Sequence, residues 1–212
     1  MKHAVLPIAF IPDAVFPSNN KEEIPTLNLA LQAEYIESPL KIWGNQARKQ
    51  KHAGTWAFYC YDYKFTALWK HPEIILQTGA SVYIEPNFST SEDMPRAVAL
   101  YGIFRKRWLC RYWQTQGIRI IVDLCVAEKF LDDNMLGIPD GWSCFATRVM
   151  RGHHELISMS YEKACEKAGG APNLFLVYGG GKEIKEYCRS RGWLHIEEQM
   201  QKVKKDMARK SP

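Results

Sequence analysis

The stretch that decides the fold of this chain is 95–124, PRAVALYGIFRKRWLCRYWQTQGIRIIVDL. Apolar side chains recur at intervals of three and four residues from Ala97 to Trp108, which predicts a helix with one buried face. Gly117 follows the helix, where a left-handed residue commonly ends one. The apolar run 118–124 then predicts a buried strand. The order helix, glycine, strand is one step of a pattern in which strands and helices alternate.

The same pattern recurs along most of the chain. The expected strands are 56–61, 82–85, 118–124, 143–147, 174–178 and 194–197. The expected helices are 64–77, which Pro72 interrupts, 95–116, 127–135, 154–168 and 182–191. Strands that alternate with helices indicate a mostly parallel sheet built from repeated βα units. We therefore predict an α/β fold with an incomplete TIM-barrel-like sheet. An open doubly wound sheet is the alternative, because both arrangements bury the strands on two faces.

The length of 212 residues favours a single domain, 1–212. Residues 1–54 are less periodic, and we expect an irregular N-terminal extension that packs on the sheet, with a strand-like alternation at 27–31. Residues 199–212 carry five basic side chains against one acidic, and we expect a basic C-terminal helix or tail there.

Composition excludes several classes of protein. Hydrophobic residues make up 46% and charged residues 24% of the chain, as in ordinary globular proteins. The apolar runs are far shorter than the ~20 residues that cross a bilayer, and the first residues do not resemble a secretion signal. We expect a cytoplasmic protein without a membrane partner. The six cysteines form no CxxC or Cys/His cluster, so no zinc site is indicated and reduced thiols are expected.

The net charge of +5 is unevenly distributed. Residues 1–100 carry 9 basic and 10 acidic side chains, whereas residues 101–212 carry 19 and 13. A basic second half attracts a polyanion such as nucleic acid, because Lys and Arg displace counterions from phosphates. A solvated cationic surface is the alternative interpretation.

Three acidic residues stand where consecutive predicted strands end, namely Asp62, Glu85 and Asp123. In both candidate folds the ligand site lies at the carboxyl ends of the strands. The three side chains are therefore candidates for catalysis, as a general acid and base, or for binding Mg²⁺ or Mn²⁺ through carboxylate oxygens. The alternative is that each carboxylate caps a following helix.

Two loops at the same edge are candidates for binding. The polar loop 85–95, which contains Asn87 and Ser89, exceeds the usual βα loop of about 2–6 residues. The glycine-rich turn at Gly180, followed by Lys182, could hold a phosphate on backbone N–H groups, although it lacks the spacing of a phosphate-binding loop. A tight βα turn explains these glycines equally well.

Cationic and aromatic side chains interleave on the helix at 95–116. Arg105, Arg107 and Arg111 alternate with Trp108, Tyr112 and Trp113. Guanidinium groups on phosphates and rings under bases are the means by which proteins bind single-stranded nucleic acid. Alternatively, the rings are core residues and the arginines pair with acids of neighbouring helices.

The central block resembles a family of uncharacterised domains encoded by phages, plasmids and other mobile elements of bacteria. Its members read PDFS, DMP, RNRW and QxxGIxVI, and this chain reads PNFS, EDMP, RKRW and QTQGIRII between residues 85 and 122. Asn87 replaces the usual Asp, and Lys106 replaces the usual Asn. Residues 61–65 with Trp69, 137–139 and 177–179 also resemble family segments. The resemblance spans about residues 59–192 and implies a mobile-element protein with an α/β fold, but no established activity. The substitution at Asn87 argues against a charged metal ligand there.

Three hypotheses about function follow from these patterns. The first is a phage or plasmid protein that acts on nucleic acid, in replication or host takeover, through Arg105, Arg107, Arg111, Lys182 and the basic tail 199–212. The second is an enzyme that acts on a phosphate-containing substrate with a divalent metal. The third is a non-catalytic inhibitor that binds a host protein.

Overall fold

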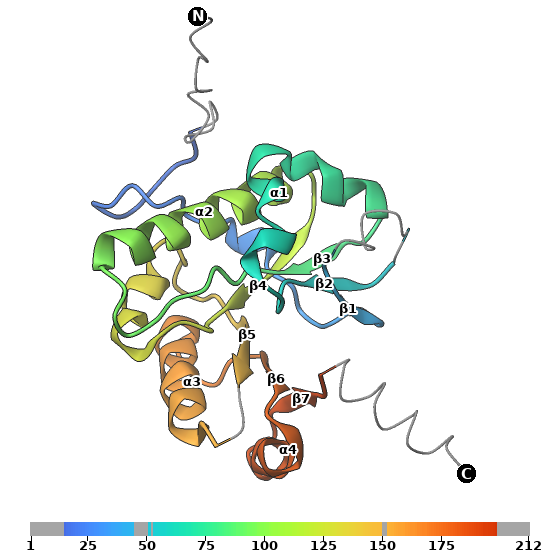
Figure 1. The fold of residues 1–212 in the computed structure, drawn as a ribbon, viewed down its shortest axis with the longest axis vertical. Helices are drawn as coiled ribbons and strands as arrows, with labels where there is room; N and C mark the ends of the chain where they lie inside the picture. The colour runs from blue at the N-terminus through green and yellow to red at the C-terminus, as the bar shows by residue number, and fades with distance from the viewer. Residues whose placement is uncertain (1–14, 45–50, 52, 150–151, 199–212) are drawn as a thin grey trace, which may run out of the picture.

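The fold is a curved sheet of seven parallel strands with helices along its outer side (Figure 1). The computed structural model describes residues 15–44, 51, 53–149 and 152–198. The strands are β1 (Leu40–Ile42), β2 (Thr55–Ala57), β3 (Val82–Ile84), β4 (Arg119–Asp123), β5 (Cys144–Val149), β6 (Leu174–Gly179) and β7 (Leu194–Ile196).

The four α-helices are α1 (Ala67–Lys70), α2 (Arg96–Thr115), α3 (His154–Ala168) and α4 (Gly181–Ser190). The expected helix at 154–168 is confirmed at both ends, and α2 and α4 differ from expectation by one residue at each end. The expected helix at 127–135 is instead two 3-10 turns, η5 (Glu128–Phe130) and η6 (Asp133–Met135). The helix expected at 64–77, with an interruption at Pro72, consists of η3 (Asp62–Lys64), α1 and η4 (Pro72–Thr78). The expected break at Pro72 is confirmed, because α1 ends before this proline and η4 begins at it.

The order of the strands decides between the two predicted architectures. Neighbouring strands follow the order of the sequence from β1 to β7, and every pair is parallel. Crossovers between parallel strands are right-handed, so an order that never reverses places all crossovers on one face of the sheet. A doubly wound sheet requires a reversal, which is absent from the described strands. The incomplete barrel is therefore confirmed.

The two faces of the sheet are packed differently. The outer face, under the helices, carries large aromatic residues such as Trp56, Phe58 and Tyr83. The rings of Phe58 and Tyr83 contact Trp113 of α2. The concave inner face carries smaller groups, among them Ala57, Ala146, Cys144, Ile121 and Leu176. Small side chains suit the inside of a tightly curved sheet, where little space remains. All six cysteines are free thiols.

The segment before β2 completes one edge of the sheet. β1 pairs with β2 and is a strand that the sequence pattern did not indicate. The expected strand at 27–31 is wrong, because the segment forms the 3-10 turn η1 (Leu29–Leu31), in which the Asn28 side chain accepts a hydrogen bond from the Ala30 N–H. Residues 199–212, expected as a basic helix or tail, lie outside the described residues. None of the described helices has the length and apolar character that a bilayer span requires.

Candidate functional site

Side chains from several strands meet on the inner face at the carboxyl edge of the half-barrel. Alternation along β4 turns Ile120 and Val122 outward and Ile121 inward, so Asp123 points inward. Tyr59, beyond the end of β2, also faces inward. Its ring stacks on the inward-facing Tyr178 of β6, with a centroid distance of 5.1 Å and an interplanar angle of 22°.

Asp123 is fully buried and is the chemically most unusual group at this edge. The Tyr59 hydroxyl donates to Asp123 Oδ1 over 3.0 Å, whereas Asp123 Oδ2 has no hydrogen-bond partner. Its main-chain oxygen accepts from Lys106 Nζ at 3.0 Å and from Asn134 Nδ2 at 3.1 Å. A buried carboxylate with one unpartnered oxygen can exchange a proton with a group that reaches it.

The pKa of Asp123 is raised to about 7, chiefly by burial and to a lesser extent by the negative charge of Glu85. The positive charge of Lys106 and the hydrogen bonds from the Tyr59 hydroxyl and the Cys125 main chain act in the opposite direction on this pKa. Burial and the nearby Asp123 also raise the pKa of Tyr59 well above its ordinary value, so its hydroxyl keeps its proton. The Asp123 carboxyl group therefore gains or loses its proton near neutral pH, next to the Tyr59 hydroxyl, which stays protonated.

Glu85 lies close to Asp123 along the edge but faces the opposite side of the sheet. Ile84 faces inward, so the next residue faces outward toward α2. There the Glu85 carboxylate pairs with the Arg107 guanidinium and lies 3.4 Å from Lys106 Nζ, and all three side chains are buried. Arg107 also donates to the main-chain oxygens of Leu136, at 3.0 Å, and Asn134. The prediction that Arg107 contacts nucleic acid is thus wrong, because its guanidinium is fully enclosed by partners.

Asp62 lies apart from the other two acids. It belongs to η3, where its carboxylate accepts from the Ser89 hydroxyl at 2.8 Å and from the Ser89 N–H at 3.1 Å. The chain runs on beyond the end of β2 before it reaches Asp62, which carries this side chain away from Asp123. In the described part of the chain, no three His, Cys, Asp or Glu side chains are grouped closely enough to hold a metal ion. The prediction that Asp62, Glu85 and Asp123 together form an Mg²⁺ or Mn²⁺ site is therefore wrong, because the three carboxylates do not come together.

The loop 85–95 is held against the segment that follows β4. Asn87 Nδ2 donates to the Cys125 main-chain oxygen over 3.4 Å, and Thr90 Oγ1 accepts from the Ala127 N–H at 2.7 Å. Asn87 thus acts as a hydrogen-bond donor, a role that the Asp usual in the resembling family could not fill when ionised. Ser89 is exposed and links this loop to η3 through Asp62.

Arg105 is half-buried and packs on aromatic rings. Its guanidinium carbon lies 3.9 Å from the ring centroid of Phe88 and 4.6 Å from that of Tyr101. Burial lowers its pKa from the ordinary value, although the charge of Asp62 acts in the opposite direction. Arg111, the third predicted cation of α2, lies 5.5 Å from the ring centroid of Phe16. Arg105 and Arg111 are therefore the members of the predicted trio that a ligand can reach.

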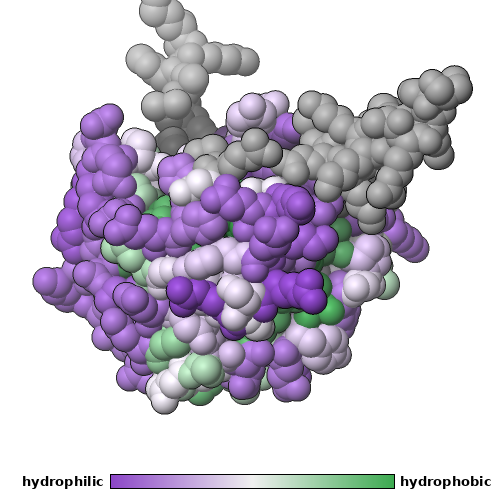
Figure 2. Space-filling model, turned by 90° about the horizontal axis from the view of Figure 1, so that it is seen from below, coloured by the Kyte–Doolittle hydropathy of each residue, from purple (hydrophilic) through white to green (hydrophobic). Residues whose placement is uncertain are grey.

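Close packing explains why the turn before α4 contains glycine. Gly180 has φ +77°, and a Cβ atom there would lie 2.4 Å from Ile184 Cγ1. Lys182 projects from α4 with 89% of its side chain exposed and lies 3.6 Å from Glu186. Figure 2 shows that the end of the molecule where α3 and α4 lie is mostly hydrophilic, as expected of solvated helix faces. These contacts support the tight-turn interpretation of the glycines.

Sequence reasoning missed several residues at the carboxyl edge. Tyr61 and Tyr63 are 72% and 69% exposed, and their rings stack at a centroid distance of 5.9 Å with an interplanar angle of 12°. Arg148, on the inner face of β5, forms an ion pair with Glu198 at 3.3 Å. The signal for Arg148 was its position at the end of a strand. The signal for Tyr61 and Tyr63 was the spacing of two tyrosines, two residues apart, just after β2.

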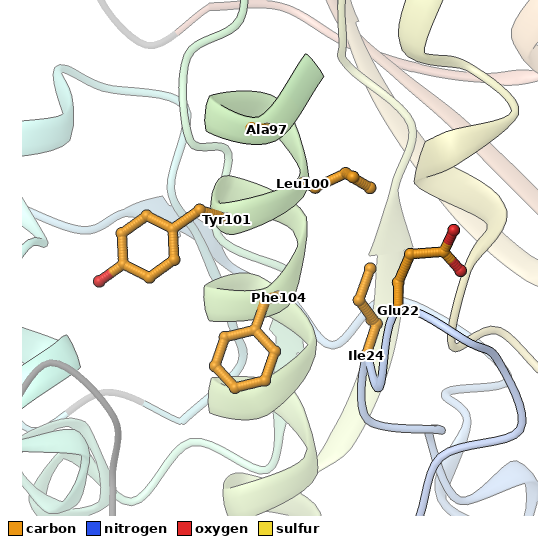
Figure 3. A pocket seen from close by; sticks show the side chains of 6 residues that line it. All are labelled: Glu22, Ile24, Ala97, Leu100, Tyr101 and Phe104. Atoms are coloured by element: carbon orange, nitrogen blue, oxygen red, sulfur yellow. The ribbon is translucent and has the colours of Figure 1, made fainter. Parts of the chain in front are cut away.

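Two hollows in the described surface lie away from these residues. One, of about 350 Å³, is lined by Ile24, Leu100 and Phe104 with Glu22 at its margin (Figure 3). The other, of about 400 Å³, is lined by charged residues that include Glu92, Lys129 and Lys163. Neither contains a residue that was singled out for the site, although Glu92 belongs to the predicted binding loop 85–95.

Comparison with known proteins places the chain in a family without an assigned activity. The gene 1 protein of Mycobacterium phage D29 is 31% identical over 191 residues, which cover 81% of this chain and 68% of the phage protein. The gene 1 protein of Mycobacterium phage L5 is 30% identical over 203 residues, which cover 84% of this chain and 86% of the phage protein. No solved structure matches. The model of the domain of unknown function DUF4417 matches residues 16–190, and the chain therefore belongs to the DUF4417 family.

Proposed function

We propose that this protein binds single-stranded nucleic acid on a rim formed by η3, the loop 85–95 and the first half of α2. The observation that carries the proposal is the exposed, stacked pair Tyr61 and Tyr63. Two large rings held parallel in solvent offer a surface on which unpaired bases stack, and stacking of this kind is tolerant of sequence.

The elements of the rim are connected by direct contacts. Phe65 packs edge to face on Phe88 with a centroid distance of 5.1 Å, and Asp62 accepts hydrogen bonds from Ser89. Phe88 in turn lies under the Arg105 guanidinium. The segment that carries the tyrosine pair is thus connected to Arg105 through the contacts of Asp62 and Phe65 with the loop 85–95, which suits a nucleic-acid strand that crosses both.

Cations flank the rings on this rim. Lys64 Nζ lies 5.9 Å from the Tyr61 ring centroid, and Arg105 is half-buried beside Tyr101. A phosphate backbone passing over the tyrosines would meet these two charges. Binding should weaken as salt rises, because each neutralised phosphate releases a counterion. The phage relatives fit a mobile-element protein that acts on nucleic acid in replication or host takeover.

Fluorescence anisotropy with labelled oligo-dT, oligo-U and duplex DNA at increasing salt tests the proposal. The double variant with Tyr61→Ala and Tyr63→Ala should bind single strands about five- to 150-fold more weakly for each stacked base that is lost, corresponding to about 1–3 kcal/mol. Arg105→Gln should weaken binding and reduce the salt dependence by about one phosphate contact.

Tyr35→Ala is the matched control. Tyr35 is also a solvent-exposed tyrosine, at 61%, but it belongs to the segment at the opposite edge of the sheet, where neighbouring residues contact the starts of β4 and β5. This variant should bind like the wild type. Equal affinities for the control and the double variant, or no binding to any of the three nucleic acids, would refute the proposal.

A further inference from the structure

The inner face at the carboxyl edge holds two charged groups that nucleic-acid stacking leaves unused. Asp123 pairs with Ala146 across the β4 and β5 ladder. Arg148 lies two residues further along β5, so its side chain points to the same inner face, one layer closer to the edge. The charge of Arg148 acts on Tyr59, whose hydroxyl holds Asp123 Oδ1.

Each of the two groups has a polar atom without a partner. Asp123 is fully buried, yet its Oδ2 accepts no hydrogen bond. The Nε of Arg148 is also buried without a partner, while its Nη2 pairs with Glu198. Buried polar atoms are normally satisfied, and exceptions point to a function or to a bound group. An acceptor and a donor left open on adjacent strands fit a ligand that supplies a donor to one and an anionic oxygen to the other.

The side chain of Arg148 is 39% exposed, so an anion can reach it from solvent. A guanidinium binds phosphate or carboxylate through paired N–H donors. Asp123 lies below it and is flanked by groups that hold it in place. The titratable and charged groups around Asp123 are Tyr59 after β2, Glu85 after β3, Lys106 from α2, and Cys125 after β4.

We propose that Asp123 and Arg148 form a proton-transfer site for a substrate with a phosphate group, in which Arg148 holds the phosphate and Asp123 is the catalytic acid-base residue. In the forward direction Asp123 Oδ2 takes a proton from an O–H or N–H group of the substrate and becomes a neutral carboxyl group. It returns that proton to the leaving or product atom, so the step moves one proton and no electrons. Tyr59 is a positioning residue that fixes the carboxylate.

Burial supports this role, because it raises the pKa of Asp123 to about 7, where both protonation states are populated at neutral pH. The site does not depend on binding of nucleic acid to the tyrosine pair, and it can be tested with inorganic phosphate alone. A failure of either proposal would leave the other standing.

The experiment follows the ¹³C carboxyl signal of Asp123 by NMR in the full chain, with Asp123→Asn to identify the signal. The wild-type signal should titrate with a midpoint near 7. Inorganic phosphate, added at constant ionic strength, should move that midpoint upward, because a bound anion disfavours the ionised carboxylate. Arg148→Gln should abolish the movement caused by phosphate.

Arg119→Gln is the matched control, because Arg119 is similarly exposed, at 44%, but begins β4 at the opposite edge of the sheet. It should respond to phosphate like the wild type. Glu198→Gln removes the partner of Arg148 and should tighten phosphate binding about two- to fivefold, the amount expected when an exposed ion pair no longer competes. This second variant tests the site even if Arg148→Gln does not fold.

Two results would overturn the proposal. One is a wild-type midpoint close to the ordinary value of 3.8 for an aspartate. The other is a response to phosphate that is absent in the wild type or is the same in wild type and Arg148→Gln.

Discussion

Glu85 and Arg107 form an ion pair in which neither side chain has any exposed surface. The pair joins the end of β3 to the middle of α2, and Lys106 contacts the same carboxylate. Main-chain oxygens after β4 accept hydrogen bonds from Arg107 Nε and Nη2. Lys106 and Arg107 of the RKRW segment are therefore part of the interior that fixes the longest helix against the sheet.

Loss of the buried carboxylate should destabilise the protein strongly. Glu85→Gln leaves the charges of Arg107 and Lys106 buried without their counterion, and we expect a loss of about 3–5 kcal/mol in the free energy of unfolding. Urea denaturation measures this quantity. Arg96→Gln is the comparison, because the Arg96 side chain that pairs with Asp133 is 59% exposed and solvent screens the pair, so this variant should lose far less stability than Glu85→Gln. Similar small losses in both variants would contradict the assignment.

The stability of the protein should depend on the protonation of Asp123. Its pKa is about 7 in the folded protein, above the ordinary value of 3.8, so the folded state binds the proton more tightly than the unfolded chain. This contribution to stability is fully present below pH 3.8 and is lost as pH rises through 7. Asp123→Asn should flatten this part of the dependence of the unfolding free energy on pH. A variant with the wild-type slope would show that another group is responsible.

Alanine substitutions at Gly180 and Gly169 distinguish the effect of close packing on stability from the effect of backbone conformation. Both have positive φ, +77° and +72°, but only Gly180 has neighbours within reach of an added Cβ. Gly169→Ala should cost about 1–2 kcal/mol through backbone strain alone. Gly180→Ala should cost about 1–3 kcal/mol more, because Ile184 and Val149 must move. Thermal or urea unfolding of the two variants measures the difference, and equal losses would argue against tight packing at this turn.

Local patterns predicted the secondary structure well where one element is long and periodic. The helix at 154–168 was placed at both ends, because its apolar spacing and the following Gly169 are local signals. The same reasoning failed at 127–135, where two short 3-10 turns replace a helix. It also missed β1, whose three residues are too few to show an alternation. Short edge strands form because a neighbour pairs with them, which adjacent residues do not encode.

The candidate site was predicted in position but not in detail. Asp123 was expected at the carboxyl edge, and the structure adds Tyr59 and Arg148 around it. Glu85 was grouped with Asp123 because both end strands, but one position of alternation turns the two carboxylates to opposite faces of the sheet. The position of the Asp62 side chain could not be predicted either, because it depends on the path of the chain beyond β2.

The sequence by itself determined that this chain alternates strands and helices in a parallel sheet, because periodicity and helix-ending glycines act over a few residues. Tertiary structure alone decided that the strands never reverse their order, that Arg107 is enclosed, and that Asp123 lies beneath Arg148. These features depend on contacts between residues far apart in the chain, and charged side chains look the same in a sequence whether water or a buried partner surrounds them.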